Sequence, residues 1–297
     1  MPQIFHNPSR RSFLKSSAQA AGLLSAYGMG LTSVLGAKKA DELHMALLSD
    51  IHISEDAQNQ YRGFFPYKNL QSVVPQVLAA KPDALLINGD VARLTGEKAD
   101  YAQVKGLLSP LADQKPIYMT LGNHDHRENI IEVFSTPKEL QDLKGKRVLV
   151  IEQPATRFVL LDSLLFTNKT PGLLGKVQRT WLGEYLAKSD NKPTVIFLHH
   201  TLSDGDGSLL DVDRFFEIIQ PYQQVKAVFY GHSHQYNFDT LDGIHLINQP
   251  AVGYNFLDTE PVGWLSGKFR KEGVDLTLHA FAGNREGDGK TTSLAWR

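Results

Sequence analysis

Short apolar runs that alternate with helical stretches constrain the fold of this 297-residue sequence most. The five clearest runs are HMALLS at 44–49, ALLIN at 84–88, IYMTL at 117–121, TVIFL at 194–198 and VKAVFY at 225–230. Helical spacing lies between or beside them at 69–80, 98–112, 176–188 and 214–219. Further strands are expected at 147–152, at 157–162 and within 244–279. This alternation predicts an α/β fold, in which a buried sheet carries helices on its faces.

Each of these five runs stops at residues that can bind a metal ion. The residues are Asp50 and His52, then Asp90, then Asn123, His124, Asp125 and His126, then His199 and His200, and finally His232 and His234. Seven of the 11 histidines lie in these places. Because sites in open α/β sheets form beyond the carboxyl ends of the strands, we expect these side chains to converge.

The residue types indicate what such a site could do. The sequence has no cysteine, which excludes disulfides, thiol catalysis and thiolate metal sites. Imidazole, carboxylate and amide ligands together suit manganese, iron or zinc. A carboxylate shared between two such ions would hold them about 3.5–4 Å apart and let them activate water for attack on a phosphate ester. A nearby imidazole would then stabilise or protonate the leaving oxygen.

Taken singly, these motifs also have purely structural explanations. The pair Gly89-Asp90 is common in turns, and so is the D-x-H pattern at 50–52. The pair His199-His200 could lie in the core or on the surface. Their order along the chain, one motif after each apolar run, favours a metal centre over five unrelated features.

The ordered motifs D-x-H, G-D, G-N-H-D, H-H and G-H-x-H resemble those of the calcineurin-like metallophosphoesterase superfamily. The resemblance covers about residues 43–280 and is greatest to the class III cyclic-nucleotide phosphodiesterases and the bacterial glycerophosphodiesterases. It implies a four-layer α/β/β/α sandwich with a dinuclear metal site where the strand ends of two sheets meet. It also implies that a hydroxide bridging the two metals attacks the phosphorus.

The resemblance implies a role for each residue that matches a family motif. It assigns the first metal to Asp50, His52 and His234, and the second to Asn123, His199 and His232. It makes Asp90 the ligand that bridges both ions. His124 matches the family's catalytic histidine, and Asp125 is expected to orient His124 or its loop.

Three further residues are candidates for contact with the substrate. The family segment H-H-P-P reads His199-His200-Thr201-Leu202 here, so the loop after His199 is expected to differ in shape. His200 could therefore face the substrate, support a ligand or be structural. His126 and Arg127 follow the G-N-H-D motif, and an exposed salt bridge is the alternative role for Arg127.

Residues 1–37 have the pattern of an export signal. The segment SRRSFLK at 9–15 contains Arg10 and Arg11 and precedes a weakly apolar run at 18–35. The paired arginines resemble the twin-arginine signal, whose machinery exports folded proteins. This predicts that machinery as a partner, a periplasmic or secreted location, and no membrane attachment after cleavage. The alternative is a membrane anchor at 18–35. The phosphoesterase domain is expected at 43–280, followed by a C-terminal tail at 281–297.

The predicted function is metal-dependent hydrolysis of a small phosphate ester. A phosphodiester is favoured, for example a cyclic nucleotide or a small organophosphodiester. The alternatives are an exported phosphomonoesterase and, less favoured, a non-catalytic metal-binding protein of the same fold. The net charge of -1, without a basic stripe, argues against stable binding of nucleic acid. No motif selects the leaving group, the metal or the oligomeric state.

Overall fold

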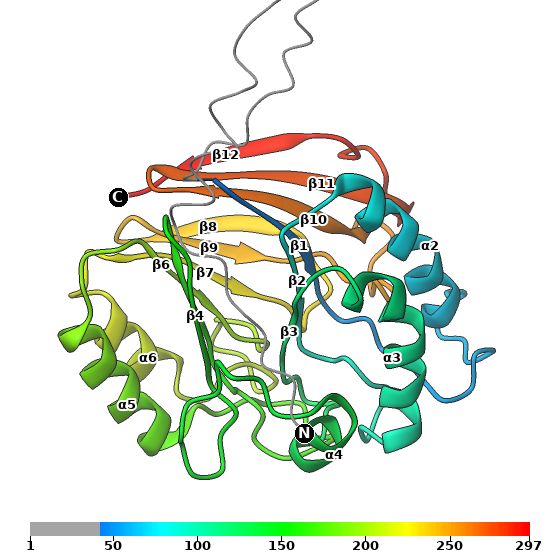
Figure 1. Ribbon diagram of the computed structural model, residues 1–297, viewed down its shortest axis with the longest axis horizontal. Coiled ribbons are helices and arrows are strands. Elements are labelled where there is room, and N and C mark those ends of the chain that lie inside the picture. Colours follow the sequence, from blue (N-terminus) through cyan, green and yellow to red (C-terminus); the bar gives the residue numbers. More distant parts are fainter. Residues whose placement is uncertain (1–41) are drawn as a thin grey trace, which may run out of the picture. The chain divides into compact units, whose positions relative to one another are not determined.

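The computed structural model describes residues 42–297, and within them the strands form two six-stranded sheets (Figure 1). The first sheet has, in spatial order, β12 (Thr291–Ala295), β11 (Gly273–Gly283), β10 (Pro261–Arg270), β1 (Leu43–Leu48), β2 (Ala84–Asn88) and β3 (Ile117–Thr120). Strands β1, β2 and β3 are parallel, so their carboxyl ends share one edge of the sheet. The proposed export signal at 1–37 lies outside the described residues.

The second sheet has the same mixed character. Its spatial order is β4 (Leu149–Glu152), β5 (Arg157–Leu160), β6 (Thr194–Phe197), β7 (Val225–Tyr230), β9 (Ile244–Asn248) and β8 (Asn237–Leu241). Strands β5, β6, β7 and β9 are parallel, and β4 and β8 are antiparallel to their neighbours. The pair β4 and β5 confirms the two strands expected on either side of Pro154.

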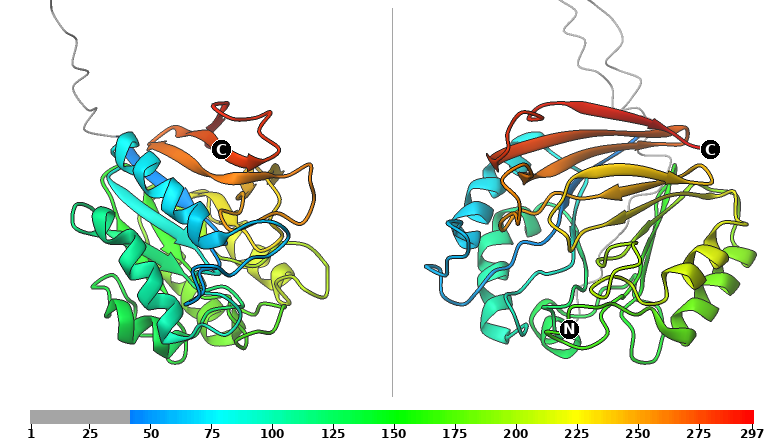
Figure 2. Two further views of the ribbon diagram at one scale, coloured as in Figure 1. Left: turned by 90° about the vertical axis from the view of Figure 1, so that its right-hand side faces the viewer. Right: turned by 180° about the vertical axis from the view of Figure 1, so that it is seen from behind.

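Helices cover the outer face of each sheet, as Figures 1 and 2 show. The first sheet is covered by α2 (Pro66–Ala80), α3 (Lys98–Ala112) and α4 (Arg127–Phe134), and the second by α5 (Gly175–Lys188) and α6 (Val212–Ile219). The inner faces pack on each other through Leu47 and Leu86 of one sheet and Phe158, Phe197 and Phe229 of the other. The layers are therefore α/β/β/α, as the family resemblance implied.

The apolar runs are continuous because both faces of the central strands are buried. In β1, Met45 and Leu47 face the other sheet, while Ala46 and Leu48 face the helices. The alternation of side chains along a strand thus supplies two separate cores from one short run.

Some boundaries differ from the sequence-based expectation. Helix α2 begins at Pro66, earlier than residue 69, since proline is well suited to the first helical turn. The first sheet continues past residue 280, because β11 ends at Gly283 and β12 pairs with it. Leu294 and Trp296 pack against the core between the sheets, so the expected C-terminal tail supplies an edge strand. In residues 42–297, every helix is too short or too polar to cross a membrane.

Candidate metal centre

The seven predicted metal ligands come together between the two sheets. Asp50 and His52 follow β1, Asp90 follows β2, and Asn123 follows β3. From the second sheet, His199 follows β6, and His232 and His234 follow β7. Parallel neighbours within each sheet place these turns at one edge, as expected from the strand ends.

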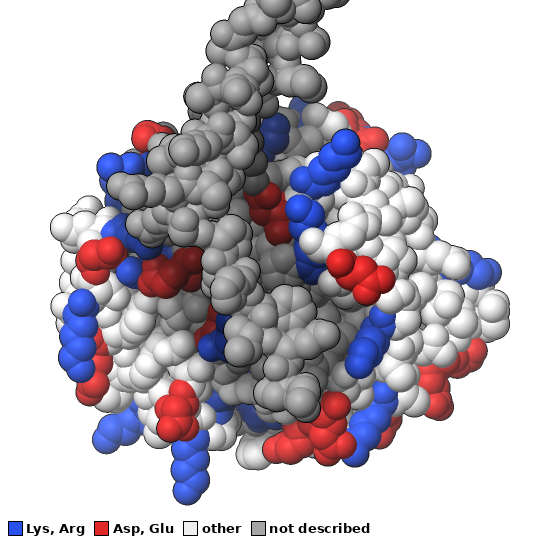
Figure 3. All heavy atoms as spheres, in the orientation of Figure 1, with Lys and Arg blue, Asp and Glu red and all other residues white. Residues whose placement is uncertain are grey.

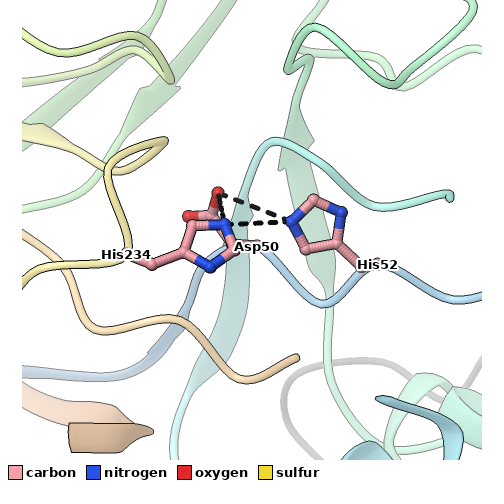
Figure 4. A group of neighbouring side chains, drawn as sticks. All are labelled: Asp50, His52 and His234. Atoms are coloured by element: carbon pink, nitrogen blue, oxygen red, sulfur yellow. Dashed lines mark hydrogen bonds and ion pairs between the residues drawn. The ribbon is translucent and has the colours of Figure 1, made fainter. Parts of the chain in front are cut away.

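Asp50, His52 and His234 form the first group of potential ligands (Figure 4). The Nε2 atom of His234 lies 3.2 Å from Oδ1 of Asp50 and 3.1 Å from Nε2 of His52. All three side chains are almost completely buried. They come from two sheets and point toward one another, which is the arrangement that a shared cation requires.

Asp90, His199 and His232 form the second group. The Oδ2 atom of Asp90 lies 3.3 Å from Nε2 of His199 and 3.7 Å from Nε2 of His52. One carboxylate oxygen therefore lies between the two groups. This is the position expected of a ligand that is shared between two ions.

Backbone carbonyls fix which nitrogen of three histidines faces the centre. Nδ1 of His199 contacts the Asn88 carbonyl at 2.9 Å, and Nδ1 of His234 contacts the Tyr254 carbonyl at 2.6 Å. Nε2 of His232 contacts the Gly207 carbonyl at 2.9 Å. A carbonyl oxygen only accepts, so each of these nitrogens carries a hydrogen, and the other nitrogen is the one that faces the centre as a possible metal ligand.

The residues present fit two cations. The Oδ1 atom of Asn123, Nε2 of His199 and Nδ1 of His232 are buried without a hydrogen-bond partner. Within residues 42–297, the ion-pair partners of Asp50 and Asp90 are all histidines. Buried acceptors that face two carboxylates need positive charge between them, which metal ions would supply.

The pKa values reflect the same demand for positive charge. Burial alone would lower the pKa of His199, but the carboxylates of Asp90 and Asp50 raise it to about 10. Burial would likewise raise the pKa of Asp50 and Asp90, but the neighbouring histidines hold both well below the usual range. Both carboxylates are thus kept ionised in a site shielded from water.

The turns that carry the ligands are conformationally strained. Five ligands have a positive φ: Asp50, His52, Asp90, His232 and His234. A non-glycine residue rarely adopts this conformation, and such strain clusters at functional sites. The chain turns sharply as it leaves β1, β2 and β7, so side chains spaced by one or two residues can face the same centre.

Two glycines of the motifs allow this close approach. At Gly89, which has a φ of +76°, an added Cβ would lie 2.4 Å from Nδ1 of His199. At Gly231, it would lie 2.3 Å from Oγ of Ser49 and 2.5 Å from Oδ2 of Asp50. The glycines that precede Asp90 and His232 therefore let the two sheets meet at the ligands.

The proposed catalytic residue His124 lines a cleft above the two groups. One of its ring nitrogens lies within 4.8 Å of ligand atoms of His52 and Asp90. Its Nδ1 contacts the Leu94 carbonyl at 3.0 Å, which leaves Nε2 as the free nitrogen. Its backbone N–H donates to Oδ1 of Asp90 at 2.9 Å, so the backbone of His124 is anchored to the predicted bridging ligand.

Asp125 is fully buried and holds the surrounding loops rather than facing the cleft. Its carboxylate accepts hydrogen bonds from the backbone N–H groups of Val91, Ala92 and Gly122. It also accepts the hydroxyl hydrogen of Tyr101 at 3.0 Å. Burial and the nearby Asp90 raise the pKa of Asp125 to about 6. Through these hydrogen bonds, Asp125 links the turn after β2 to the turn after β3.

The three candidate substrate contacts lie away from the cleft lining. His200 is completely buried, with Nδ1 at 2.8 Å from the Ser163 hydroxyl and its ring 4.9 Å from that of His232. His126 is the N-cap of α4 and contacts Glu128 at 3.2 Å. Arg127 forms a bidentate contact with the buried carboxylate of Asp162, at 2.7 and 2.9 Å.

The cleft has a volume of about 380 Å³ and includes residues that sequence reasoning missed. Besides the metal groups and His124, its side chains are those of Asn168, Thr170, Thr201, Ser208, Ser233, Tyr254 and Phe256. Most of them lie in loops without a motif, and only the tertiary fold brings these loops to the strand ends. Two of them had a local signal: Ser233 lies within the G-H-x-H motif, and Thr201 belongs to the segment that departs from H-H-P-P.

Comparison with known proteins agrees with this geometry. The sequence pattern of the calcineurin-like phosphoesterases matches residues 43–236, and the chain belongs to this family. It is therefore a metallophosphoesterase, and the His and Asp clusters indicate a dinuclear metal site.

Similar proteins include several phosphodiesterases. A Synechococcus protein named "Probable cyclic nucleotide phosphodiesterase" is 29% identical over 239 residues, which cover 78% of this chain and 89% of that protein. The 3',5'-cyclic adenosine monophosphate phosphodiesterase CpdA of Vibrio vulnificus is 27% identical over 260 residues, with 81% and 87% covered. The glycerophosphodiester phosphodiesterase GpdQ of Enterobacter lignolyticus is 26% identical over 231 residues, with 73% and 81% covered.

Solved structures share the fold. A dimetal phosphatase from Danio rerio superimposes with a TM-score of 0.67 at 15% identity, covering 86% of this chain and 99% of that protein. PhoD superimposes with a TM-score of 0.57 at 12% identity, covering 87% of this chain and 69% of that protein. At these identities the likeness concerns the architecture alone.

Proposed function

We propose that this protein hydrolyses small phosphodiesters at a dinuclear metal centre. The observation that carries the proposal is the position of the Asp90 carboxylate between two groups of buried ligands, beneath a cleft that His124 lines. The names of the similar proteins favour a diester over a monoester. The cleft volume of about 380 Å³ favours a small substrate.

Each of the two metal ions would be held by its own group of residues. Asp50, His52 and His234 would bind one ion, and Asn123, His199 and His232 the other. Asp90 would contact both, which keeps the pair together. When bound, a pair of manganese, iron or zinc ions would supply a hydroxide nucleophile and neutralise charge on the phosphoryl oxygens.

His124 is the group proposed to act on the leaving oxygen. The Leu94 carbonyl holds the hydrogen on Nδ1, so Nε2 is free to donate or accept a proton at the substrate. The backbone hydrogen bond to Asp90 holds the loop of His124 against the metal ligands. His124 therefore has a defined orientation without being required as a ligand.

The experiment that tests this function joins metal analysis to a substrate panel. The purified protein would be assayed with Mn²⁺ against bis(p-nitrophenyl) phosphate, p-nitrophenyl phosphate, cyclic AMP and glycerophosphoethanolamine. We expect two metals per chain and faster turnover of diesters. A preference for the monoester would support the phosphomonoesterase alternative, and two bound metals without turnover of any ester would contradict an enzymatic role.

The surface is consistent with a small substrate. On the face shown in Figure 3, basic and acidic side chains are interspersed, and neither sign dominates the coloured area. A long nucleic acid would require a continuous basic track.

We also propose that the protein is exported by the twin-arginine route to the periplasm or beyond. The support is the sequence of residues 9–35, in which Arg10 and Arg11 precede an apolar stretch. A route that carries folded proteins would let the metal centre load before export, so that metal availability outside would not select the ions.

A further inference from the structure

The cleft above the metal groups combines aromatic and polar lining. Tyr254 and Phe256 supply two aromatic rings. The other lining side chains outside the metal groups and His124 are polar, namely Asn168, Thr170, Thr201, Ser208 and Ser233. A cleft of this composition suits a ligand with one flat apolar part and several hydrogen-bonding groups.

Phe256 is the aromatic ring that a ligand can reach. Its side chain is 41% exposed, whereas Tyr254 is only 3% exposed. The Phe256 ring stacks on that of His234, with centroids 4.4 Å apart and an interplanar angle of 30°. Arg62 donates a hydrogen bond to the Phe256 carbonyl at 2.7 Å, which ties down the backbone of this segment.

Tyr254 supports the platform from within. Its ring is stacked on that of His52 at 4.7 Å and lies 5.7 Å from that of Phe256. The Tyr61 ring packs against that of Tyr254, with centroids 4.7 Å apart, and the guanidinium of Arg93 lies 5.2 Å from the Tyr61 ring. The exposed ring of Phe256 therefore packs against the rings of His234 and Tyr254, which are both buried.

We propose that Phe256 is a specificity-determining residue of the cleft, whose exposed ring stacks on a planar group carried by the phosphodiester, such as the base of a nucleotide. The inference rests on the proposed function, since it concerns the same cleft. Phe256 touches His234, a ligand of the first group, so a phosphate held at the centre would place an attached base beside the ring. The volume of about 380 Å³ suits one nucleotide and not a polymer.

Stacking explains why the site would tolerate different bases. Every nucleobase has a flat π-face, so an aromatic side chain binds it without reading its hydrogen-bonding edge. Removal of such a ring weakens binding of a nucleotide by about 5- to 100-fold. A diester without a ring, such as glycerophosphoethanolamine, has nothing to stack and would be insensitive to this loss.

The test compares Phe256→Ala with Phe256→Trp and the control Leu257→Ala on two substrates. Leu257 is the exposed neighbour of Phe256 and does not line the cleft. For Phe256→Ala, we expect the ratio of kcat/KM for cyclic AMP to that for glycerophosphoethanolamine to fall by about 5- to 100-fold. Phe256→Trp should retain the ratio, and Leu257→Ala should leave it at the wild-type value.

A binding measurement separates this inference from the proposed function. The Kd of adenosine 5'-monophosphate, a nucleotide that carries the base, is compared with that of inorganic phosphate by calorimetry. Phe256→Ala should raise the Kd of the nucleotide by about 5- to 100-fold and leave the Kd of phosphate unchanged. An equal loss for both ligands, or for both diesters, would show that Phe256 merely supports His234 and would overturn the proposal. If the wild type hydrolysed neither diester, the proposed function would fail, and the binding comparison would still decide the role of Phe256.

Discussion

At the scale of single residues, the centre depends on atoms whose hydrogen-bond partners lie far away in the sequence. His199 is oriented by the Asn88 carbonyl, and His234 by the Tyr254 carbonyl. These contacts fix Nδ1 as a donor and aim Nε2 of each ring at the carboxylates, so a bound metal would replace the hydrogen on Nε2 of His199. Ion binding would then need little rearrangement of the side chains.

The first prediction concerns Asp90. Replacing Asp90 with asparagine removes the charge that lies between the two ligand groups while keeping the volume of the side chain. We expect Asp90→Asn to lose at least one metal and most of its activity, measured by metal analysis and phosphodiester turnover. A variant that retained two metals and near-normal turnover would refute the bridging role.

The second prediction separates His124 from the ligands. His124→Ala should keep both metals but lose turnover by about 10²–10⁴-fold, since a proton donor to the leaving oxygen is removed. The loss should shrink as the leaving group becomes more acidic. The neighbouring His126 lies outside the cleft lining, so His126→Ala is the matched control and should turn over normally. A loss that did not depend on the leaving group would point to phosphate positioning instead.

At the scale of secondary structure, the strand ends must approach one another closely. Gly89 directly follows β2 and lies against the His199 ring that follows β6. The centre therefore joins two elements of different sheets through a contact that leaves no space for a side chain.

Gly89→Ala and Gly106→Ala give opposite predictions. An added Cβ at Gly89 would clash with the His199 ring, and we expect a loss of about 1–3 kcal/mol in stability together with weaker metal binding. Gly106 lies on the exposed side of α3 with nothing within 4 Å of an added Cβ. Gly106→Ala should therefore stabilise the protein by about 0.5–1 kcal/mol. Chemical denaturation and metal titration of both variants measure the difference, and a stable, metal-replete Gly89→Ala protein would contradict it.

At the scale of the whole molecule, the centre connects the two sheets. Its ligands follow β1, β2 and β3 on one side and β6 and β7 on the other. Metal ions bound there would act across the interface between the sheets. Without the ions, buried carboxylates and imidazoles would face one another with only their own charges to balance them.

Metal removal should therefore lower thermal stability. With free metal about 1,000-fold above its Kd, binding contributes about 4 kcal/mol to stability. For a protein of this size, that corresponds to a fall in Tm of about 8–16 °C on chelation. Calorimetry before and after treatment with a chelator measures the shift, and readdition of metal should restore it. If chelation lowered the Tm of Asp90→Asn by as much as that of the wild type, the metal centre would not be the cause of the shift.

Export is the last prediction at this scale. Conservative replacement of Arg10 and Arg11 by lysine should leave a folded protein in the cytoplasm, because the paired arginines are the proposed recognition element. Cell fractionation of the wild type and the double variant measures the effect. If both reached the periplasm equally, the twin-arginine interpretation would be wrong. Retention of the wild type in membranes after a carbonate wash would instead favour an anchor at 18–35.

The sequence by itself determined the alternation of strands and helices and the family. It also determined the positions of the motifs that hold the candidate metal ligands, at Asp50, Asp90, Asn123, His199 and His232. Those features are local: a run is buried because its own residues are apolar, and a motif follows directly where the run ends. The same local signals were insufficient for the neighbours of the motifs. They indicated which stretches approach the centre, but not the direction in which each side chain points.

Only the tertiary structure decided those directions. His200 points at Ser163 and Arg127 at Asp162, partners about 35 residues away that no local pattern indicates. Phe256 reaches the cleft because its loop packs on the turn of His234, which comes from a different part of the second sheet. A buried polar group must find a hydrogen-bond partner, and that partner can come from any segment that the fold brings near. Side-chain orientation and the lining of the cleft therefore follow from packing between distant segments.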